Sequence, residues 1–256
     1  MHDVTVEILE NKKINAVYWK LTFSSSKLSD NVRPGQFLNI QIENSTAPLW
    51  RRPFSYYRVS GPKVEILYEV VGCGTEKLSQ KKRGSTLKIL GPLGKGFSQK
   101  IGAKRRILVG GGCGVPPLIF LAGKTKLSDS TPPILLFGCQ SDDAILPKTE
   151  LSKLKNLVSY ATEDGSCGTK GFVTKLLEKI LKENNPKKLF IQTCGPKAMM
   201  EAVMRMARTV GVDGELSFDE RMACGIGACL GCVVETKEGR KTSCHDGPVF
   251  SFEELP

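Results

Sequence analysis

Histidine is almost absent from this 256-residue sequence, which contains only His2 and His245. His2 lies at the very start of the sequence, and His245 directly follows a cysteine. Histidine is the side chain used most often as a general acid or base near neutral pH. We therefore do not expect a proton-transfer mechanism based on histidine.

Long hydrophobic runs are also absent. The longest uncharged stretch, residues 107–123, contains five glycines and two prolines, so it is too short and too broken to span a bilayer. The first residues, Met1 to Val6, show no basic segment followed by an apolar one, which is the pattern of a secretory signal. These two absences predict a cytoplasmic protein.

Acidic residues are outnumbered, since 37 Lys and Arg against 26 Asp and Glu give a net charge of +11. The basic residues are scattered along the chain, and the densest groups, at 81–83 and 104–106, hold three residues each. No nucleic-acid-binding motif accompanies the charge, so we expect no nucleic-acid role. An acidic partner protein, or solubility alone, explains the charge equally well.

Cysteine, in contrast, is frequent, with nine residues. Five are isolated in the sequence and are expected to be reduced thiols: Cys73, Cys113, Cys139, Cys167 and Cys194. The other four lie within 21 residues, at Cys224, Cys229, Cys232 and Cys244.

The spacing of these four cysteines is C-x4-C-x2-C followed by a fourth cysteine after eleven residues. This is the plant-type ferredoxin pattern, in which four thiolates hold a [2Fe–2S] cluster. Small residues between the ligands, such as Gly225 and Gly227, let backbone N–H groups approach the sulfurs. The alternative is a structural zinc site, but zinc modules usually pair their ligands as C-x2-C twice. The spacing favours the iron–sulfur cluster.

Three zones with different periodicity follow one another along the chain. Residues 1–98 show short alternating segments separated by turn signals, which predicts an antiparallel barrel or sandwich. Its strands are expected at 4–9, 18–23, 37–42, 64–71 and 87–90.

Residues 99–213 alternate apolar strands with helical stretches, which predicts a parallel sheet covered by helices. Residues 214–256 form the small cysteine-rich region. The fold class is therefore multidomain, β plus α/β. In the second zone we expect strands at 106–109, 134–137, 157–161 and 189–193 and helices at 117–127, 148–155, 172–183 and 196–210.

Two motifs in the first zone suit a flavin site. Arg52-Pro53-Phe54-Ser55 offers a guanidinium for a pyrophosphate and a hydroxyl for the isoalloxazine ring. Gly72-Cys73-Gly74-Thr75 follows a strand, so its backbone N–H groups and the Thr75 hydroxyl can surround a phosphate. A strand start and a glycine-rich turn are the simpler alternatives. Together, and in this order, the motifs predict bound FAD.

Two strand-end loops in the second zone suit a nicotinamide nucleotide. Residues 110–118, which include Gly111, Gly112 and Gly114, follow a strand and open a helix, where a nucleotide phosphate meets a helix N-terminus. The run departs from the G-x-G-x-x-G fingerprint, which disfavours a separate Rossmann dehydrogenase. Cys194-Gly195-Pro196 ends another strand, and its side chains are predicted to reach the place where a nicotinamide meets the flavin, with Cys194 as the candidate catalytic residue. An ordinary buried thiol is the alternative for Cys194.

The order of these motifs resembles the ferredoxin–NADP reductase superfamily over residues 1 to about 210. The segments 220–232 and 244–250 extend this to a closer resemblance, over the whole chain, to the electron-transfer subunits of NAD-linked dihydroorotate dehydrogenases.

This resemblance implies a six-stranded FAD barrel at 1–98, an NAD domain at 99–213 and a cluster region at 214–256. It implies Arg52, Pro53, Ser55, Gly72, Gly74 and Thr75 as flavin contacts, and Gly111, Gly112, Gly114 and residues 194–196 as nicotinamide contacts. Cys224, Cys229, Cys232 and Cys244 carry over as cluster ligands.

The resemblance also implies an FMN-containing catalytic partner that oxidises dihydroorotate, in a heterotetramer. Electrons would pass from that FMN through the cluster and FAD to NAD⁺. The acidic pair Glu163-Asp164 would repel a 2′-phosphate, which favours NAD over NADP. The nearest alternative is a reductase subunit of a sulfide dehydrogenase, of an NADH-dependent ferredoxin:NADP oxidoreductase or of a hydrogenase diaphorase. A nucleotide-binding module with a structural zinc region is a further alternative.

Overall fold

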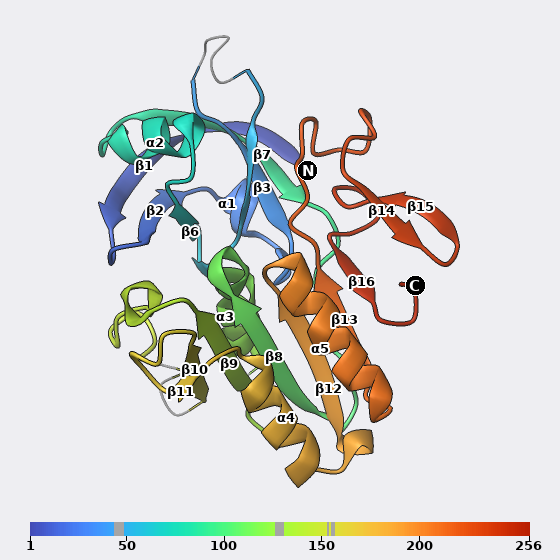
Figure 1. Ribbon diagram of the computed structural model, residues 1–256. Helices are drawn as coiled ribbons and strands as arrows, with labels where there is room; N and C mark the ends of the chain where they lie inside the picture. Colours follow the sequence, from blue (N-terminus) through green and yellow to red (C-terminus); the bar gives the residue numbers. More distant parts are fainter. Residues whose placement is uncertain (44–48, 126–130, 153, 155–156) are drawn as a thin grey trace.

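The computed structural model describes residues 1–43, 49–125, 131–152, 154 and 157–256, and its N-terminal part is an antiparallel sheet (Figure 1). Seven described strands pair in the order β4-β3-β7-β1-β2-β6-β5. Register shifts in β1 and β3 bend the sheet toward a barrel. Its elements are β1 (His2–Lys13), β2 (Tyr18–Ser24), α1 (Ser26–Ser29), β3 (Phe37–Gln41), β4 (Arg52–Ser55), β5 (Arg58–Ser60), β6 (Lys63–Glu69), α2 (Cys73–Gln80) and β7 (Thr86–Leu93).

Alternation of side chains explains why these segments are strands. In β1, Val6 and Ile8 are buried while Glu7 is exposed, so one face of the strand meets the core. All five strands expected in this zone are confirmed, whereas β4, β5 and the two helices were not expected. The resemblance implied six strands, and the described sheet has seven.

The second sheet lies below the first in Figure 1 and is parallel except at one edge. Its order is β11-β10-β9-β8-β12-β13-β16. Successive strands are added on one side of β8 up to β11 and then on its other side from β12, so the strand order reverses between β8 and β12. The strands are β8 (Arg105–Gly111), β9 (Ile134–Cys139), β10 (Val158–Thr162), β11 (Thr169–Lys170), β12 (Leu189–Cys194), β13 (Gly214–Ser217) and β16 (Val249–Ser251). The helices are α3 (Val115–Thr125), α4 (Thr174–Glu183) and α5 (Lys197–Thr209), with 3₁₀ turns at Gly112–Gly114, Asp142–Ala144 and Pro186–Lys188.

Helices cover both faces of this sheet. In β8, Ile107 and Val109 face the apolar cluster that contains α4 and α5, whereas Leu108 faces the cluster that contains α3. This two-sided burial requires continuous apolar strands, which is what the sequence shows. The expected β plus α/β fold class is confirmed. Within the described residues, no helix is both long and apolar enough to cross a membrane.

Three of the four expected helices are present, but the one expected at 148–155 is not. Its described residues, 148–152 and 154, form turns, and 153 and 155 lie outside the described residues, as do the last two residues of the expected helix 117–127. Tertiary contacts explain the turn conformation. The Glu150 carboxylate accepts hydrogen bonds from Lys20 Nζ at 2.5 Å, Arg58 at 2.7 Å and the Tyr57 hydroxyl at 3.1 Å. Lys20 and Arg58 belong to β2 and β5 of the antiparallel sheet, and Tyr57 directly precedes β5.

The C-terminal region is built on the hairpin of β14 (Val233–Thr236) and β15 (Gly239–Thr242). The chain then returns to the second sheet, where β16 pairs antiparallel with β13. The parallel strand β13 begins at Gly214, one residue beyond the expected boundary at 213, and β16 comes from within the third zone. The domain limits at 98 and 213 stay predictions from the sequence.

Arg106 joins the two sheets through a buried polar network. Its side chain is fully buried in β8 and donates hydrogen bonds to the Ser98 carbonyl at 2.8 Å, to Gln192 at 2.8 Å and to the Gln99 carbonyl. Gln192 in turn donates to Glu215 at 2.8 Å, and the Ser98 N–H donates to Glu215 at 3.0 Å. The network holds the segment that leaves the antiparallel sheet against strands β8, β12 and β13.

Replacing Arg106 with Met should reduce the free energy of unfolding by about 3–5 kcal/mol, because several buried acceptors would lose their charged donor. Lys104→Met is the matched control, since Lys104 forms an exposed ion pair with Asp213 and should change stability by less than about 1 kcal/mol. Urea unfolding at pH 7 measures both. Equal losses in the free energy of unfolding would show that the Arg106 network stabilises the protein no more than an exposed ion pair does.

Candidate functional site

The loops after β8 and β12 meet at the point where the strand order reverses, which is where ligands bind in open parallel sheets. A Cβ atom at Gly114 would lie 2.2 Å from the carbonyl group of Cys194. Only glycine permits this approach. The close contact brings together the two loops that the sequence predicts to bind a nicotinamide nucleotide.

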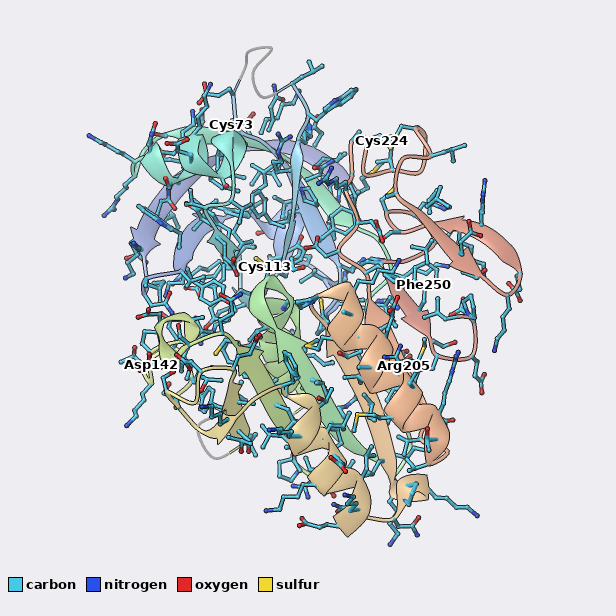
Figure 2. The ribbon with its side chains drawn as sticks, viewed as in Figure 1. Cys73, Cys113, Asp142, Arg205, Cys224 and Phe250 are labelled. Atoms are coloured by element: carbon cyan, nitrogen blue, oxygen red, sulfur yellow. The ribbon has the colours of Figure 1, made fainter. Side chains whose placement is uncertain are left out.

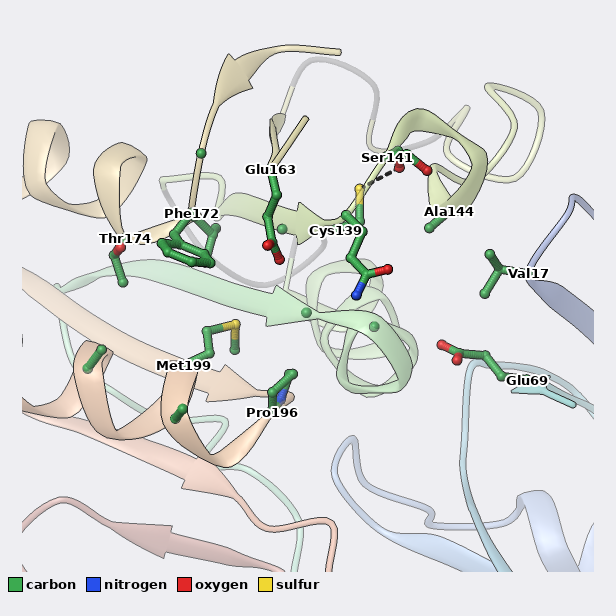
Figure 3. A pocket seen from close by; sticks show the side chains of 18 of the residues that line it. Val17, Glu69, Cys139, Ser141, Ala144, Glu163, Phe172, Thr174, Pro196 and Met199 are labelled. Carbon is green, nitrogen blue, oxygen red and sulfur yellow. Dashed lines mark hydrogen bonds between the residues drawn. The ribbon is translucent and has the colours of Figure 1, made fainter. Parts of the chain in front are cut away.

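A pocket of about 660 Å³ opens beside these loops (Figure 3). Three of the predicted residues, Gly111, Gly112 and Pro196, line it, while Gly114 and Gly195 lie in the contact between the loops. The pocket is also lined by residues that were not predicted as nucleotide contacts, among them Tyr18, Glu69, Cys139, Phe172 and Met199.

One end of this larger pocket carries Glu163 and Phe172, and Glu69 lies at the other end (Figure 3). Phe172 is two-thirds exposed, at 66%. Asp164, the second member of the predicted acidic pair, accepts hydrogen bonds from the Ser166 N–H and hydroxyl, which lower the pKa of Asp164. Of the predicted acidic pair, Glu163 lines the pocket and Asp164 does not.

A second, smaller pocket of about 210 Å³ lies between the two sheets. It is lined by every residue of the first flavin motif, Arg52, Pro53, Phe54 and Ser55, and by Thr75 of the second motif. Gly72 and Gly74 do not line it, but a Cβ atom at Gly74 would lie 3.2 Å from Arg52 Nε. The fold thus places the two predicted flavin motifs side by side.

The hydroxyl of Thr75 stabilises its own loop. It accepts hydrogen bonds from the N–H groups of Val71 at 2.9 Å and Gly72 at 3.2 Å, and it donates to the Gly72 carbonyl at 3.0 Å. This arrangement orients the first turn of α2, whose free N–H groups can meet an anion. Arg52 donates to the Trp50 carbonyl at 2.8 Å, which holds its guanidinium beside the same turn.

Cys194 lines the smaller pocket and is 5% exposed. Burial, and then the nearby carboxylate of Asp219, raise the pKa of the Cys194 thiol to about 12, although Ser217 partly opposes the shift. The side chain is therefore a neutral thiol at the junction of the two pockets. Cys113, an exposed residue that lines the smaller pocket, lies at the same junction, where β8 meets the antiparallel sheet (Figure 2).

Sequence reasoning missed three polar residues at this junction: Tyr18, Glu69 and Asp219. Burial, and then the nearby Glu220 and Glu69, raise the pKa of Asp219. Tyr18 begins β2 and Glu69 ends β6, and neither belongs to a motif, so no local pattern marks them.

The four clustered cysteines come together through the β14–β15 hairpin. The hairpin pairs Val233 with Thr242, which places Cys244 beside Cys232, and the Ser243 N–H donates to the Cys232 carbonyl at 2.8 Å. The eleven residues between these two cysteines thus form two short strands and the turn that joins them. Figure 2 shows Cys224 on the loop above this hairpin.

Backbone N–H groups point at the sulfurs, as a [2Fe–2S] site requires. Cys224 Sγ accepts from the N–H groups of Ile226 and Cys229 at 3.4 Å each, and Cys244 Sγ accepts from Gly227 at 3.1 Å. Gly227 has φ of +83°, a conformation that favours glycine. The loop is therefore shaped by its glycines to surround thiolates.

The thiols lie as two pairs. Burial acts to raise the pKa of Cys224, but the N–H groups and the Cys229 thiol donate to it and lower the pKa to about 6. Burial, followed by the neighbouring Cys232 thiol, raises the pKa of Cys244 to about 12. In the described residues, no three His, Cys, Asp or Glu side chains are grouped to hold a single metal ion. Two pairs of thiolates match two irons, with two thiolates each.

The cysteine region packs directly beside the smaller pocket. Cys232 and Cys244 form an apolar cluster with Phe37 and Leu93, and Met222 packs against it. Phe37 and Met222 also line the smaller pocket. The three candidate sites are therefore contiguous.

Two family models match the chain in the expected order. Residues 108–205 match the oxidoreductase NAD-binding domain, and residues 219–256 match the iron-sulfur cluster binding domain of dihydroorotate dehydrogenase B. The second match covers all four clustered cysteines.

Relatives match over nearly the whole length. The chain is 38% identical over 252 residues to a dihydroorotate dehydrogenase B (NAD(+)) electron transfer subunit from Caldanaerobacter subterraneus, covering 97% of this chain and 96% of that one. It is 37% identical to the subunit of the same name from Fusobacterium nucleatum, covering 98% and 96% of the two chains.

Among solved structures, a chain of an NADH-dependent reduced ferredoxin-NADP oxidoreductase, described for flavin-based electron bifurcation, superposes with a TM-score of 0.85 at 29% identity. The match covers 98% of this chain and 89% of that one. The higher identity to the dihydroorotate dehydrogenase subunits, and the match of the cysteine region to their iron–sulfur domain, disfavour the alternative reductase subunits. This chain belongs to the family of electron transfer subunits of dihydroorotate dehydrogenase B (NAD(+)).

Proposed function

We propose that this chain carries electrons from a dihydroorotate-oxidising catalytic subunit to NAD⁺, as the electron transfer subunit of dihydroorotate dehydrogenase B. The contiguity of the three sites carries this proposal. Glu69 lines both pockets, and Phe37 and Met222 join the smaller pocket to the cysteine cluster. A flavin exchanges electron pairs with a nicotinamide and single electrons with an iron–sulfur cluster, so it suits the middle position.

The smaller pocket takes FAD. Arg52 and the turn formed by Gly72, Gly74 and Thr75 would hold the pyrophosphate, because they combine a guanidinium with the N-terminus of α2. Pro53, Phe54 and Ser55 would contact the ring system from β4.

The larger pocket takes NAD. Gly111, Gly112 and Gly114 would let its phosphates approach the backbone at the start of α3, and Gly195 and Pro196 would close the other side. Cys194, a neutral thiol where the two pockets adjoin, would help to position the reacting rings.

The four cysteines Cys224, Cys229, Cys232 and Cys244 hold the [2Fe–2S] cluster in this proposal. A catalytic partner follows from the function of an electron transfer subunit. We propose that the partner contains FMN, that the two chains form a heterotetramer, and that the complex is cytoplasmic.

Cys229→Ala should abolish electron transfer from dihydroorotate to NAD⁺ in the reconstituted complex, because the cluster would lose a ligand. NADH oxidation with ferricyanide should persist, since it needs only the flavin. Cys229 is the clearest choice because it is exposed, and Cys167→Ala is the control, since Cys167 lines neither pocket and lies outside the cysteine cluster. NADH formation and iron and sulfide content are the measurements. Full dihydroorotate-dependent turnover in Cys229→Ala would contradict the ligand assignment. No NADH from the wild-type complex would point to a different partner.

Arg52→Ala should weaken FAD binding by about 2–5 kcal/mol, because a partly buried pyrophosphate would lose its charged partner. Arg51→Ala is the neighbouring control, since Arg51 instead pairs with Asp3 at 3.0 Å. Flavin content after gel filtration, read from visible absorbance, separates the two. If both variants retain FAD equally, Arg52 is not a pyrophosphate contact.

Glu163→Gln should improve the use of NADPH relative to NADH by about fivefold, the effect of one unit charge a few ångströms away in water. The control is Glu178→Gln, an exposed change on α4 where Glu178 pairs with Lys182. The ratio of kcat/KM for NADPH and NADH, with ferricyanide as acceptor, is the measurement. An unchanged ratio would remove Glu163 from nucleotide selection.

A further inference from the structure

The two pockets meet at a carboxylate that none of the predicted motifs contains. Among the described residues, Glu69 alone lines both pockets. It ends β6, and a Cβ atom added at Gly112 would lie 3.7 Å from its Oε1, so the carboxylate sits against the first loop of the nucleotide site. Figure 3 shows Glu69 at the end of the larger pocket opposite Glu163 and Phe172.

Beside this carboxylate lies a buried hydroxyl with no partner. Tyr18 lines the larger pocket and is 1% exposed, yet its hydroxyl makes no hydrogen bond within the part of the chain that the structure describes. Tyr18 lies opposite Glu69 across the β2–β6 pair, and both line the larger pocket with Cys139. Burial, then the charges of Glu69, Cys113 and Cys139, and last an interaction of the hydroxyl with the Glu69 carboxylate raise the pKa of Tyr18. A buried hydroxyl normally has a partner, so this one is suited to a ligand.

The two side chains complement a primary amide. The Glu69 carboxylate only accepts hydrogen bonds, and the Tyr18 hydroxyl can donate one. A nicotinamide carries a carboxamide with an NH₂ donor and a carbonyl acceptor. Electron-pair exchange requires the nicotinamide and the flavin to touch, and the only described residue common to their proposed pockets is Glu69.

We propose that Glu69 and Tyr18 form the binding site for the nicotinamide carboxamide, and that the charge of Glu69 selects the oxidised coenzyme. The Glu69 carboxylate accepts from the amide NH₂, and the Tyr18 hydroxyl donates to the amide carbonyl. The nicotinamide ring is cationic in NAD⁺ and neutral in NADH, so a nearby carboxylate stabilises the complex with NAD⁺ more. The proposal rests on the proposed function, because it takes the larger pocket as the NAD site.

The charge is tested by Glu69→Gln, which keeps a hydrogen-bond acceptor but removes the negative charge. Equilibrium dissociation constants for NAD⁺ and NADH are measured by titration of the full-length protein, at equal FAD content and fixed ionic strength. We expect Kd for NAD⁺ to rise about tenfold, which corresponds to about 1.4 kcal/mol, while Kd for NADH changes less than about threefold. Equal changes for the two coenzymes would overturn the selection by charge.

The hydroxyl is tested by Tyr18→Phe, with Tyr56→Phe as the matched control. The Tyr56 hydroxyl is buried but donates to the Leu28 carbonyl at 2.7 Å, away from both pockets. Tyr18→Phe should raise the Kd values of NAD⁺ and NADH alike, by about fivefold. It should leave Tm unchanged, because it removes a hydroxyl that has no hydrogen-bond partner in the free protein. Tyr56→Phe should lower Tm and leave both Kd values unchanged. The reverse pattern would show that Tyr18 has only a structural role.

The amide itself is tested with 3-acetylpyridine adenine dinucleotide, which is cationic but lacks the NH₂ group. The wild-type protein should bind it more weakly than NAD⁺, and Glu69→Ala should remove that difference. If the difference persists in Glu69→Ala, Glu69 does not contact the amide and the proposal fails while the NAD site stands. If the wild-type protein binds neither NAD⁺ nor NADH, the proposed function fails as well.

Discussion

The C-terminal region is hydrogen-bonded to both sheets, and the arrangement of the three sites depends on this double contact. Strand β16 pairs with β13 at the edge of the parallel sheet. Just before β16, the Lys95 N–H donates to the Gly247 carbonyl at 2.5 Å, which ties the same segment to the end of the antiparallel sheet. Asn39 on β3 adds a hydrogen bond to the Cys224 carbonyl at 3.3 Å. The cysteine loop is thereby held beside the smaller pocket.

This arrangement suits a protein that moves electrons between separate centres. The cysteine cluster, the smaller pocket and the larger pocket share lining residues, so no long segment of chain separates one site from the next. Arg106 acts at the other side of the junction, where its buried guanidinium holds the linker after β7 against β8 and β12. The relative position of the sheets is therefore set by polar contacts at two places.

The environment differs between the thiols of the junction and those of the cluster. Cys194 has a raised pKa because it is buried and lies near the Asp219 carboxylate, so it remains neutral. Around Cys224, backbone N–H groups outweigh burial and stabilise a thiolate. The same residue type is thus held as a neutral thiol in one place and as a thiolate in the other, because of what donates to its sulfur.

Features with local signals could be predicted from the sequence. The alternation of apolar and polar residues predicted the strands of the first sheet. The C-x4-C-x2-C spacing indicated the cysteine loop, and the glycines after β8 indicated the nucleotide loop. The family followed from the order of these motifs.

Tertiary structure alone decided the contacts between residues far apart in the chain. The segment around Glu150 forms turns rather than a helix because Lys20 and Arg58, on the antiparallel sheet, bind the Glu150 carboxylate. Tyr18 and Glu69, 51 positions apart in the sequence, became neighbours because β2 pairs antiparallel with β6 and places Tyr18 opposite Glu69. Local periodicity reports which face of a strand is buried, and it carries no information about which distant side chain will lie opposite.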